Sequence, residues 1–354
     1  MIGGCNMKPK IALITDTDNW AFYNIAVVLS EKLKDYYEFK IIPATTALQE
    51  NVLQTILLVQ DCDLVHFFWR GLLFSLDNEN VVFKRNNLDV DEFIKEKFTK
   101  IVKTTCIPDH ALLDEKNIEA TKKVLNLLDG YYTLSSKLFD IYSNLGCKKP
   151  QRFIINGVND KFFIPENLER FSVENLQDRQ ITIGWAGNSK WGDWENLEDS
   201  KGVYTIIKPA IKELKEEGYN VELKLADKKD RVIPIDEMKE FYNNIDIYVC
   251  ASKTEGGPNP ILESMCSGVP IISTNVGIVE DVLGPKQKEF MFERSKDNLK
   301  EKIKYLLNNK EMFKELSEEN LEESKKCTYD VVAMQFKEFF DYNLNKKRNE
   351  INNG

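Results

Sequence analysis

Short apolar runs alternate with longer stretches of helical period along most of the chain. The first run spans residues 11–14 and reads Ile-Ala-Leu-Ile. Behind it, apolar side chains recur at positions 22, 25, 26, 29 and 33, which is the spacing that one face of a helix requires. The pattern predicts a buried strand followed by an amphipathic helix.

The same alternation continues in two series, separated by a turn at Asn156-Gly157. In the first series, further strands are expected at 39–42, 64–69, 101–105, 131–134 and 152–155. In the second, strands are expected at 181–185, 221–225, 247–250, 270–273 and 289–292, with helices near 202–217, 235–242, 260–266 and 296–308. Strands separated by helices predict an α/β fold with parallel, doubly wound sheets.

Residues 157–180 have scattered charges, a proline at 165 and no strong period, which is typical of a connector. We therefore expect a first wound domain over residues 1–160 and a second over 161–327. The remaining segment, 328–354, predicts a helix that packs back across the first domain and frays at its end. Two wound domains in tandem would bind ligands in a cleft between the carboxyl ends of their strands.

Composition excludes several classes of protein. With 42% apolar and 30% charged residues, the chain is typical of a soluble globular protein. Its net charge of −9 disfavours nucleic acid as a partner. No run approaches the roughly 18 apolar residues of a membrane helix, and residues 1–15 lack the features of a signal peptide, so we expect a cytoplasmic location.

The cysteines and histidines argue against a metal site. Seven cysteines, never spaced as Cys-x-x-Cys, indicate buried thiols in a reducing compartment. The two histidines, His66 and His110, form no cluster with them. We expect no metal bound by protein ligands alone.

The densest group of chemically informative residues lies between 251 and 272. A buried strand ends before it, and a helix is expected to begin near Pro260 with Asn259 as its cap. The free N–H groups and dipole at this helix start favour an anion, and glycines let the backbone approach a phosphate closely. The residues expected to line this phosphate site are Gly256, Gly257, Pro258, Asn259 and Pro260.

Two carboxylates bracket the expected anion site, Glu255 on the loop and Glu263 one turn into the helix. A carboxylate beside a diphosphate is repelled unless it accepts hydrogen bonds from hydroxyls, so a sugar is the natural partner for both. The alternative is an ordinary helix start and a tight loop between core elements.

This segment resembles the E-x7-E signature of the retaining GT-B glycosyltransferases of the large family four, the group 1 type. The stretch 246–252 is similar to the family's preceding strand, and 268–277 to its "G-x-P-V-I-x-T-x-x-G". Asn156-Gly157-Val158-Asn159 with Pro165 resembles the interdomain "N-G-V-D…F-x-P". The resemblance covers about residues 150–340, and the first half only by the order of its elements.

The resemblance implies two Rossmann-like domains facing across a cleft, and transfer of a sugar, of the hexosyl type, from a UDP- or GDP-sugar to an acceptor hydroxyl with retention of configuration. Glu263 would hold the ribose and Glu255, as a catalytic residue, the donor sugar, with neither acting as nucleophile. The departing phosphate would take the acceptor's proton. No cofactor or metal is expected.

The resemblance also indicates where the cations for the diphosphate lie. Lys201 resembles the lysine of the family's "K-G" and would bind phosphate. Many relatives also carry an arginine after the first strand of this domain, and in this sequence Trp185 stands near that place. Lys190 would substitute for it from a loop in which Gly187 and Asn188 offer backbone N–H groups; alternatively, Lys190 is a solvated surface lysine.

The nucleobase of the donor would lie near Ile233. The alternative is that this segment is a plain surface loop. In the first domain, His110 follows an expected strand roughly where relatives place a histidine near donor and acceptor, and would orient a hydroxyl or stabilise charge. His66 is expected in the core. Asp16 and Trp20 follow the first strand, and we weigh acceptor contact equally against helix capping in that loop.

The acceptor would be a glycan, a lipid-linked glycan or a protein, in the synthesis of a bacterial polysaccharide, glycolipid, teichoic-type polymer or glycoprotein. The lysines and apolar residues of 93–103 favour a packed, solvated helix over peripheral membrane contact. Two rival functions stay open: a non-catalytic sugar-nucleotide-binding partner of a transferase, and a sugar-nucleotide epimerase of the same fold. The sequence does not predict an oligomeric state.

Overall fold

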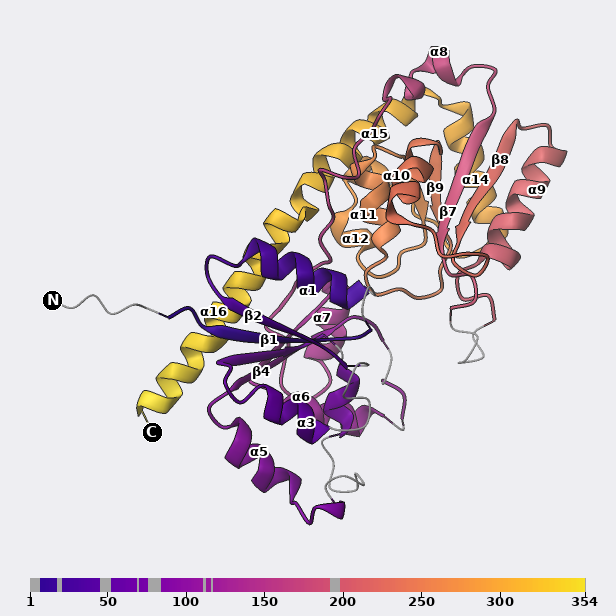
Figure 1. Ribbon diagram of the computed structural model, residues 1–354. Helices are drawn as coiled ribbons and strands as arrows, with labels where there is room; N and C mark the ends of the chain where they lie inside the picture. Colours follow the sequence, from indigo (N-terminus) through magenta and orange to yellow (C-terminus); the bar gives the residue numbers. More distant parts are fainter. Residues whose placement is uncertain are drawn as a thin grey trace. The chain divides into compact units, whose positions relative to one another are not determined.

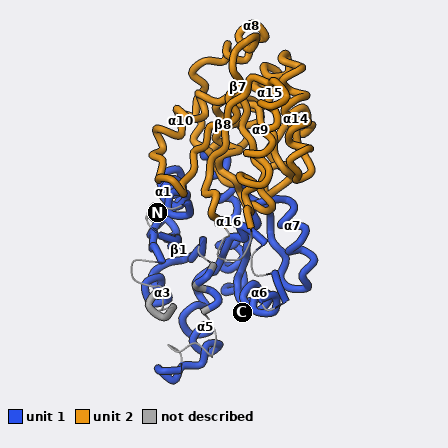
Figure 2. Tube along the Cα trace, turned by 90° about the vertical axis from the view of Figure 1, so that its right-hand side faces the viewer, with its two compact units in different colours: residues 1–155, 329–354 blue, residues 156–328 orange. Residues whose placement is uncertain are grey.

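The structure is a computed structural model that describes residues 7–17, 21–44, 52–68, 70–75, 84–110, 113–115, 117–191 and 198–353. Its internal contacts divide the chain into two compact units (Figure 2). Unit 1 comprises residues 1–155 and 329–354, and unit 2 comprises residues 156–328. Each unit is a parallel-sheet α/β structure, which confirms the predicted fold class.

Unit 1 is built on a six-stranded parallel sheet of order β2-β1-β3-β4-β5-β6 (Figure 1). Its strands are β1 Lys10–Thr15, β2 Glu38–Pro43, β3 Leu64–Phe67, β4 Val102–Ile107, β5 Gly130–Thr133 and β6 Arg152–Phe153. Its helices are α1 Ala21–Lys32, α3 Val52–Leu58, the 3-10 helix Arg70–Ser75, α5 Val90–Phe98, α6 Ile118–Leu127, α7 Ser136–Ser143 and α16 Tyr329–Asn353. Phe93 and Phe98 of α5 are buried, in keeping with the packed helix favoured for this segment.

The long C-terminal helix α16 belongs to unit 1 and is held there by polar and aromatic contacts. Tyr37 Oη donates a hydrogen bond to Asp341 Oδ1 at 2.6 Å. Asp129 lies 2.8 Å from Lys103 Nζ and 3.2 Å from Lys347 Nζ, which ties the helix to the sheet. The helix continues to Asn353, through the tail that was expected to fray.

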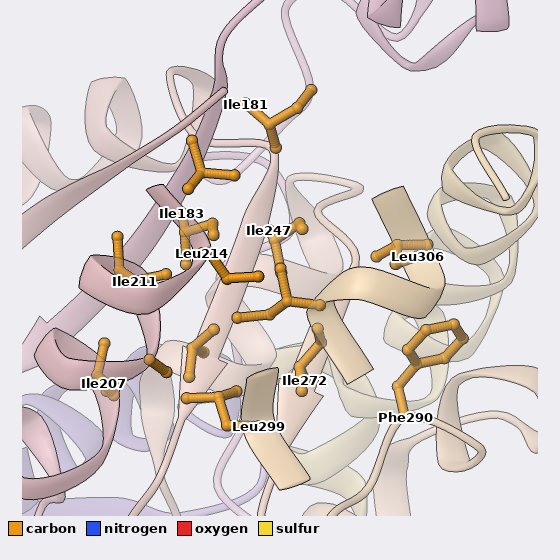
Figure 3. Packing of buried hydrophobic residues seen from close by; sticks show 14 of the residues in the cluster. Ile181, Ile183, Ile207, Ile211, Leu214, Ile247, Ile272, Phe290, Leu299 and Leu306 are labelled. Carbon is orange, nitrogen blue, oxygen red and sulfur yellow. The ribbon is translucent and has the colours of Figure 1, made fainter. Parts of the chain in front are cut away.

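Unit 2 is built on a four-stranded parallel sheet of order β10-β9-β7-β8. Its strands are β7 Ile181–Gly187, β8 Val221–Asp227, β9 Ile247–Cys250 and β10 Ile271–Ser273. Its longer helices are α9 Lys208–Glu216, α10 Ile235–Asn243, α11 Asn259–Cys266, α14 Lys296–Asn308 and α15 Glu311–Ser324. Ile183, Ile247, Leu299 and Phe290 belong to one cluster of buried hydrophobic side chains in its core, in which Phe290 lies beside Leu306 and Ile272 (Figure 3).

Two elements of unit 2 differ from expectation. The expected strand at 289–292 is wrong: Met291 makes a single bridge to Ser273, while Phe290 and Phe292 are buried in the core. The expected helix from 202 begins as a π-helical turn, Val203–Ile207, before α9. Pro209 lacks the N–H that would donate to residue 205, so the first turn takes the wider spacing.

The six cysteines in the described part of the chain are free thiols, and all but Cys147 are buried, as expected. Within the residues that the structure describes, no helix combines the length and apolarity needed to cross a membrane.

Candidate functional site

The loop 251–258 joins the buried strand β9 to helix α11 in unit 2. The helix begins at Asn259, one residue earlier than expected, because the Ile261 N–H donates to the Pro258 carbonyl oxygen at 3.0 Å. Asn259 was expected to cap the helix, but Pro258 occupies the cap position. The Asn259 side chain instead accepts a hydrogen bond from Asn156 Nδ2 at 3.0 Å.

Glu255 and Lys201 bind each other in this structure. Lys201 Nζ lies 2.5 Å from Glu255 Oε1, and the two side chains are only 12% and 18% exposed. Ser252 Oγ donates to the same carboxylate oxygen at 2.7 Å. The Lys201 ammonium also lies over the ring of Trp191, 4.5 Å from its centroid. The two residues that were predicted to contact a sugar and a phosphate are therefore brought together as an ion pair.

The backbone around Lys201 explains why its side chain reaches Glu255. Gly202 has φ of +71°, and a Cβ there would lie 2.5 Å from the Ala251 carbonyl oxygen, so only glycine permits this approach. Arg294 donates from Nε to that same oxygen at 2.9 Å and from Nη2 to the Asp199 carbonyl oxygen at 2.8 Å. Arg294 thus links the segment before Lys201 to the start of the loop after β9. Nothing in the sequence around Arg294 indicates this role.

Three contacts hold the glycine-rich part of the loop in place. Asn156 Nδ2 also donates to the Gly257 carbonyl oxygen at 3.2 Å. Gly277 has φ of +53°, and a Cβ there would collide with the Gly256 carbonyl oxygen. Thr274 Oγ1 donates to the Ser252 carbonyl oxygen at 2.8 Å. The segment after β10 thus sets the position of the loop that carries Glu255.

Glu263 lies one turn into α11 and is half-buried. The fully buried Tyr242 of α10 donates from Oη to Glu263 Oε2 at 2.6 Å. Burial raises the pKa of Glu263, while the Tyr242 hydrogen bond and the positive charge of Lys228 act in the opposite direction. Tyr242 was not singled out from the sequence, where it is one more aromatic residue of a helix.

The loop after β7 places the remaining predicted donor residues. The strand ends at Gly187, and Asn188 Oδ1 accepts a hydrogen bond from the Lys190 backbone N–H at 3.1 Å. The side chain of Lys190 is exposed. Trp185, which was expected to stand near the place of an arginine in the resembled family, is a core residue only 2% exposed. Ile233 is half-buried in the segment between β8 and α10.

In unit 1, the predicted residues follow the carboxyl ends of β1 and β4. Asp16 is buried, and its Oδ1 accepts a hydrogen bond from the Tyr23 N–H at 3.1 Å, so the structure gives it a contact of the capping kind. Burial raises the pKa of Asp16 against the effect of the helix N–H groups. Trp20 lies outside the described residues.

The two histidines differ in burial. His110 is half-buried, and its Nδ1 has no hydrogen-bond partner among the described residues. Burial lowers the pKa of His110. His66 is fully buried in the core, as predicted. Its Nδ1 lies 2.9 Å from Thr104 Oγ1, and it is surrounded by aromatic rings from β5, from α16 and from Phe68, the residue after β3.

Across the described ranges, no group of three or more His, Cys, Asp or Glu side chains is placed to hold a metal ion. Of the two Asp-x-Asp triplets in the sequence, Asp61 pairs with Lys10 and Asp63 accepts from the Lys10 backbone N–H at 2.7 Å. These carboxylates join β1 to the start of β3. Asp18 of the other triplet lies outside the described residues.

Residues 212–323, which include Glu255 and Glu263, match the sequence family described as "Glycosyl transferases group 1". Among curated proteins, the chain is 29% identical over 182 residues to Protein CapJ of Staphylococcus aureus, covering 46% of this chain and 43% of CapJ. It is 25% identical over 179 residues to the capsular polysaccharide biosynthesis glycosyltransferase CapM of the same organism, covering 44% of this chain and 45% of CapM. The matches span less than half the length of these relatives.

Solved structures share the fold over nearly the whole chain. Anabaena Alr3699/HepE, crystallised with UDP, superposes with a TM-score of 0.65 at 11% identity, covering 94% of this chain and all of that one. Sucrose-phosphate synthase from Thermosynechococcus elongatus gives 0.64 at 14% identity, covering 95% and 99%. The chain has the GT-B fold of two Rossmann-like domains. The stretch that matches the group 1 glycosyl transferases lies within unit 2.

Proposed function

We propose that this protein is a retaining glycosyltransferase that moves a sugar from a nucleotide diphosphate donor, a UDP- or GDP-sugar, to an acceptor hydroxyl. The observation that carries the proposal is the pair of carboxylates on the loop and helix after β9. Glu255 is balanced by a cation, and Glu263 is held by a buried phenol. Both lie inside the segment that matches group 1 glycosyl transferases.

In the proposed mechanism, Glu263 accepts hydrogen bonds from the ribose hydroxyls and Glu255 from hydroxyls of the donor sugar. Lys201 leaves Glu255 to bind the diphosphate, which the positive end of α11 also favours. The acceptor oxygen attacks the anomeric carbon on the face from which the diphosphate departs. As the bond from that carbon to the phosphate oxygen breaks, this oxygen takes the acceptor's proton, so no protein base is needed. Catalysis then consists of orientation and stabilisation of the phosphate charge, without a metal.

The named relatives guide the choice of acceptor. CapM is described as a capsular polysaccharide glycosyltransferase, and a Bacillus subtilis relative as a putative teichuronic acid biosynthesis glycosyltransferase. We therefore propose an acceptor in the assembly of a bacterial polysaccharide or teichoic-type polymer, with lipid-linked glycans as the first acceptors to test. In unit 1, His110 is our candidate for contact with the acceptor hydroxyl.

The proposal is tested by thermal-shift binding of UDP, GDP, ADP and CDP, with and without Mg²⁺, to the wild type and Glu263→Ala. We expect one nucleotide to stabilise the wild type without metal, by about 2.7 kcal/mol at a hundredfold excess over Kd. The mutant should bind it more weakly. No shift with any nucleotide, in a sample that unfolds cooperatively, would refute the donor site. A shift only with Mg²⁺ would refute metal independence.

The second candidate is a non-catalytic sugar-nucleotide-binding partner. One observation favours it, namely that Trp185 is a core residue near the place where relatives carry a phosphate-binding arginine. Glu255→Gln separates the two functions. An enzyme loses turnover of the sugar donor that the screen identifies, while a binding partner shows no turnover in the wild type and keeps its cellular function in the mutant.

A further inference from the structure

We propose that Tyr242 is the positioning residue for Glu263: its hydroxyl holds one carboxylate oxygen so that the other is presented to the hydroxyls of the nucleotide's sugar. The inference rests on the proposed function and assigns a role to a residue outside the loop and its helix. It explains how a flexible glutamate side chain is fixed before the ligand arrives.

The contact is direct, and the phenol has little freedom to do anything else. Tyr242 is fully buried on α10, packed edge-on against Phe163, Phe241 and Tyr248. Its Oη donates to Glu263 Oε2 at 2.6 Å. A ring locked by packing on three sides delivers its hydroxyl to one point, and a buried hydroxyl is costly to leave without a partner.

Glu263 is complementary to this arrangement. Within the described part of the chain, Tyr242 is the one residue that donates a side-chain hydrogen bond to the Glu263 carboxylate. Its side chain is half-buried, so one part of it is still open to solvent. One carboxylate oxygen is thus fixed, and the other keeps its lone pairs for a ligand. A ribose diol donates two hydrogen bonds, which an ionised carboxylate accepts better than a protonated one.

The Tyr242 phenol also affects the ionisation of Glu263. The charged and titratable groups near Glu263 are Tyr242 of α10, Lys228 after β8, Tyr248 of β9 and Cys266 of α11. Burial raises the pKa of Glu263, and the Tyr242 hydrogen bond lowers it toward the ordinary range. A phenol with a pKa raised far above 10 stays protonated, so it donates without cancelling the carboxylate's charge. Loss of this donor should raise the pKa of Glu263, and the ionised form should then be lost at a higher pH.

The decisive experiment compares UDP or GDP binding, whichever the wild type prefers, between pH 5 and 8.5 for wild type, Tyr242→Phe and Tyr248→Phe. The control is Tyr248→Phe, which also removes a buried hydroxyl. The Tyr248 hydroxyl donates to the Ala186 carbonyl oxygen at 3.4 Å and not to Glu263. We expect Tyr242→Phe to weaken binding about five- to tenfold at neutral pH, and the ratio of its Kd to that of the wild type to rise further as pH falls. The ligand's own titration cancels in this ratio. The control should stay within about twofold at every pH.

Two further variants keep the test sharp. In a Glu263→Gln background, Tyr242→Phe should have no additional pH-dependent effect, because the titrating partner is gone. Replacement of Tyr242 by 3-fluorotyrosine, a stronger donor of similar size, should move the acid limb of binding to lower pH, and it decides the matter if the phenylalanine variant does not fold. A constant Kd ratio across pH, or an equal loss in the Tyr248→Phe control, would overturn the role of Tyr242. A wild type that binds no nucleotide would instead overturn the proposed function.

Discussion

Because Lys201 is paired with Glu255, nucleotide binding should have a competitor inside the protein. The two side chains are mostly buried, and the ammonium–carboxylate contact is 2.5 Å long. A hydrogen bond between charged groups in such a place contributes about 1.5–3 kcal/mol. If the diphosphate must take Lys201 from Glu255, this energy is subtracted from nucleotide affinity. Glu255→Gln removes the charge and keeps the shape, so we expect UDP or GDP to bind about 10- to 100-fold more tightly while sugar transfer falls at least 100-fold.

The assay is calorimetric titration of the nucleoside diphosphate, with turnover measured in parallel. Ser252→Ala is the matched control, because it removes the other hydrogen bond to the same Glu255 oxygen and leaves both charges in place. Its nucleotide affinity should change by less than about threefold. In a Lys201→Met background the gain from Glu255→Gln should disappear. If Glu255→Gln weakens binding of the nucleoside diphosphate, then Glu255 and the diphosphate do not compete for Lys201, and the reasoning is wrong.

Two further predictions concern the scaffold. Gly277→Ala forces a Cβ against the Gly256 carbonyl oxygen, so it should lower the free energy of unfolding by about 2–4 kcal/mol and weaken nucleotide binding. Its control is Gly146→Ala, also at positive φ but with open space around it. In denaturant titrations the control should lose only about 1 kcal/mol, and its nucleotide binding should be intact. Burial lowers the pKa of His66 to about 3, so the unfolded chain takes up the proton first as pH falls below about 6.5. The stability from this group is complete above that pH and should be about 2 kcal/mol smaller at pH 5, a loss that His66→Phe should abolish in denaturant titrations; an unchanged acid limb in that variant would contradict it.

Much of the fold could be predicted because its central strands, such as β1, β3, β5 and β9, are buried on both faces and therefore appear as continuous apolar runs. The expected strand at 247–250 coincides with β9, and the helix at 296–308 with α14. The strand expected at 289–292 failed for a physical reason. Phe290 and Phe292 alternate with more exposed residues as a strand requires, but they reach the core from a segment that touches the sheet at one bridge. The alternation of apolar and polar residues therefore indicates which side chains are buried, but not whether the segment pairs with a neighbouring strand.

The site could be predicted in part for a similar reason. Glu255, Glu263 and the glycines lie within one short stretch, where spacing along the chain is close to spacing in the structure. Tyr242 and Arg294 come from other elements, and only the packing of those elements brings them to the loop. Asn156 stands in a motif that was interpreted as a domain boundary. Its side chain binds the Gly257 carbonyl oxygen, a contact that no local pattern encodes.

The last prediction concerns Lys190, which we propose as a substitute for the phosphate-binding arginine of the resembled glycosyltransferases. Lys201 and Lys228 bring two positive charges, and Glu255 and Glu263 bring two negative ones, so the proposed diphosphate would still need a further cation. Lys190 is exposed at the end of β7, where its contribution would be modest and screened by salt. If it binds phosphate, Lys190→Met should weaken nucleotide binding about two- to fivefold and flatten its dependence on ionic strength between about 0.05 and 0.5 M salt. Lys212→Met, which removes an exposed charge on α9 of the same unit, should change neither. Equal, negligible effects of the two substitutions would identify Lys190 as a solvated surface lysine and leave the helix α11 terminus and Lys201 to hold the diphosphate.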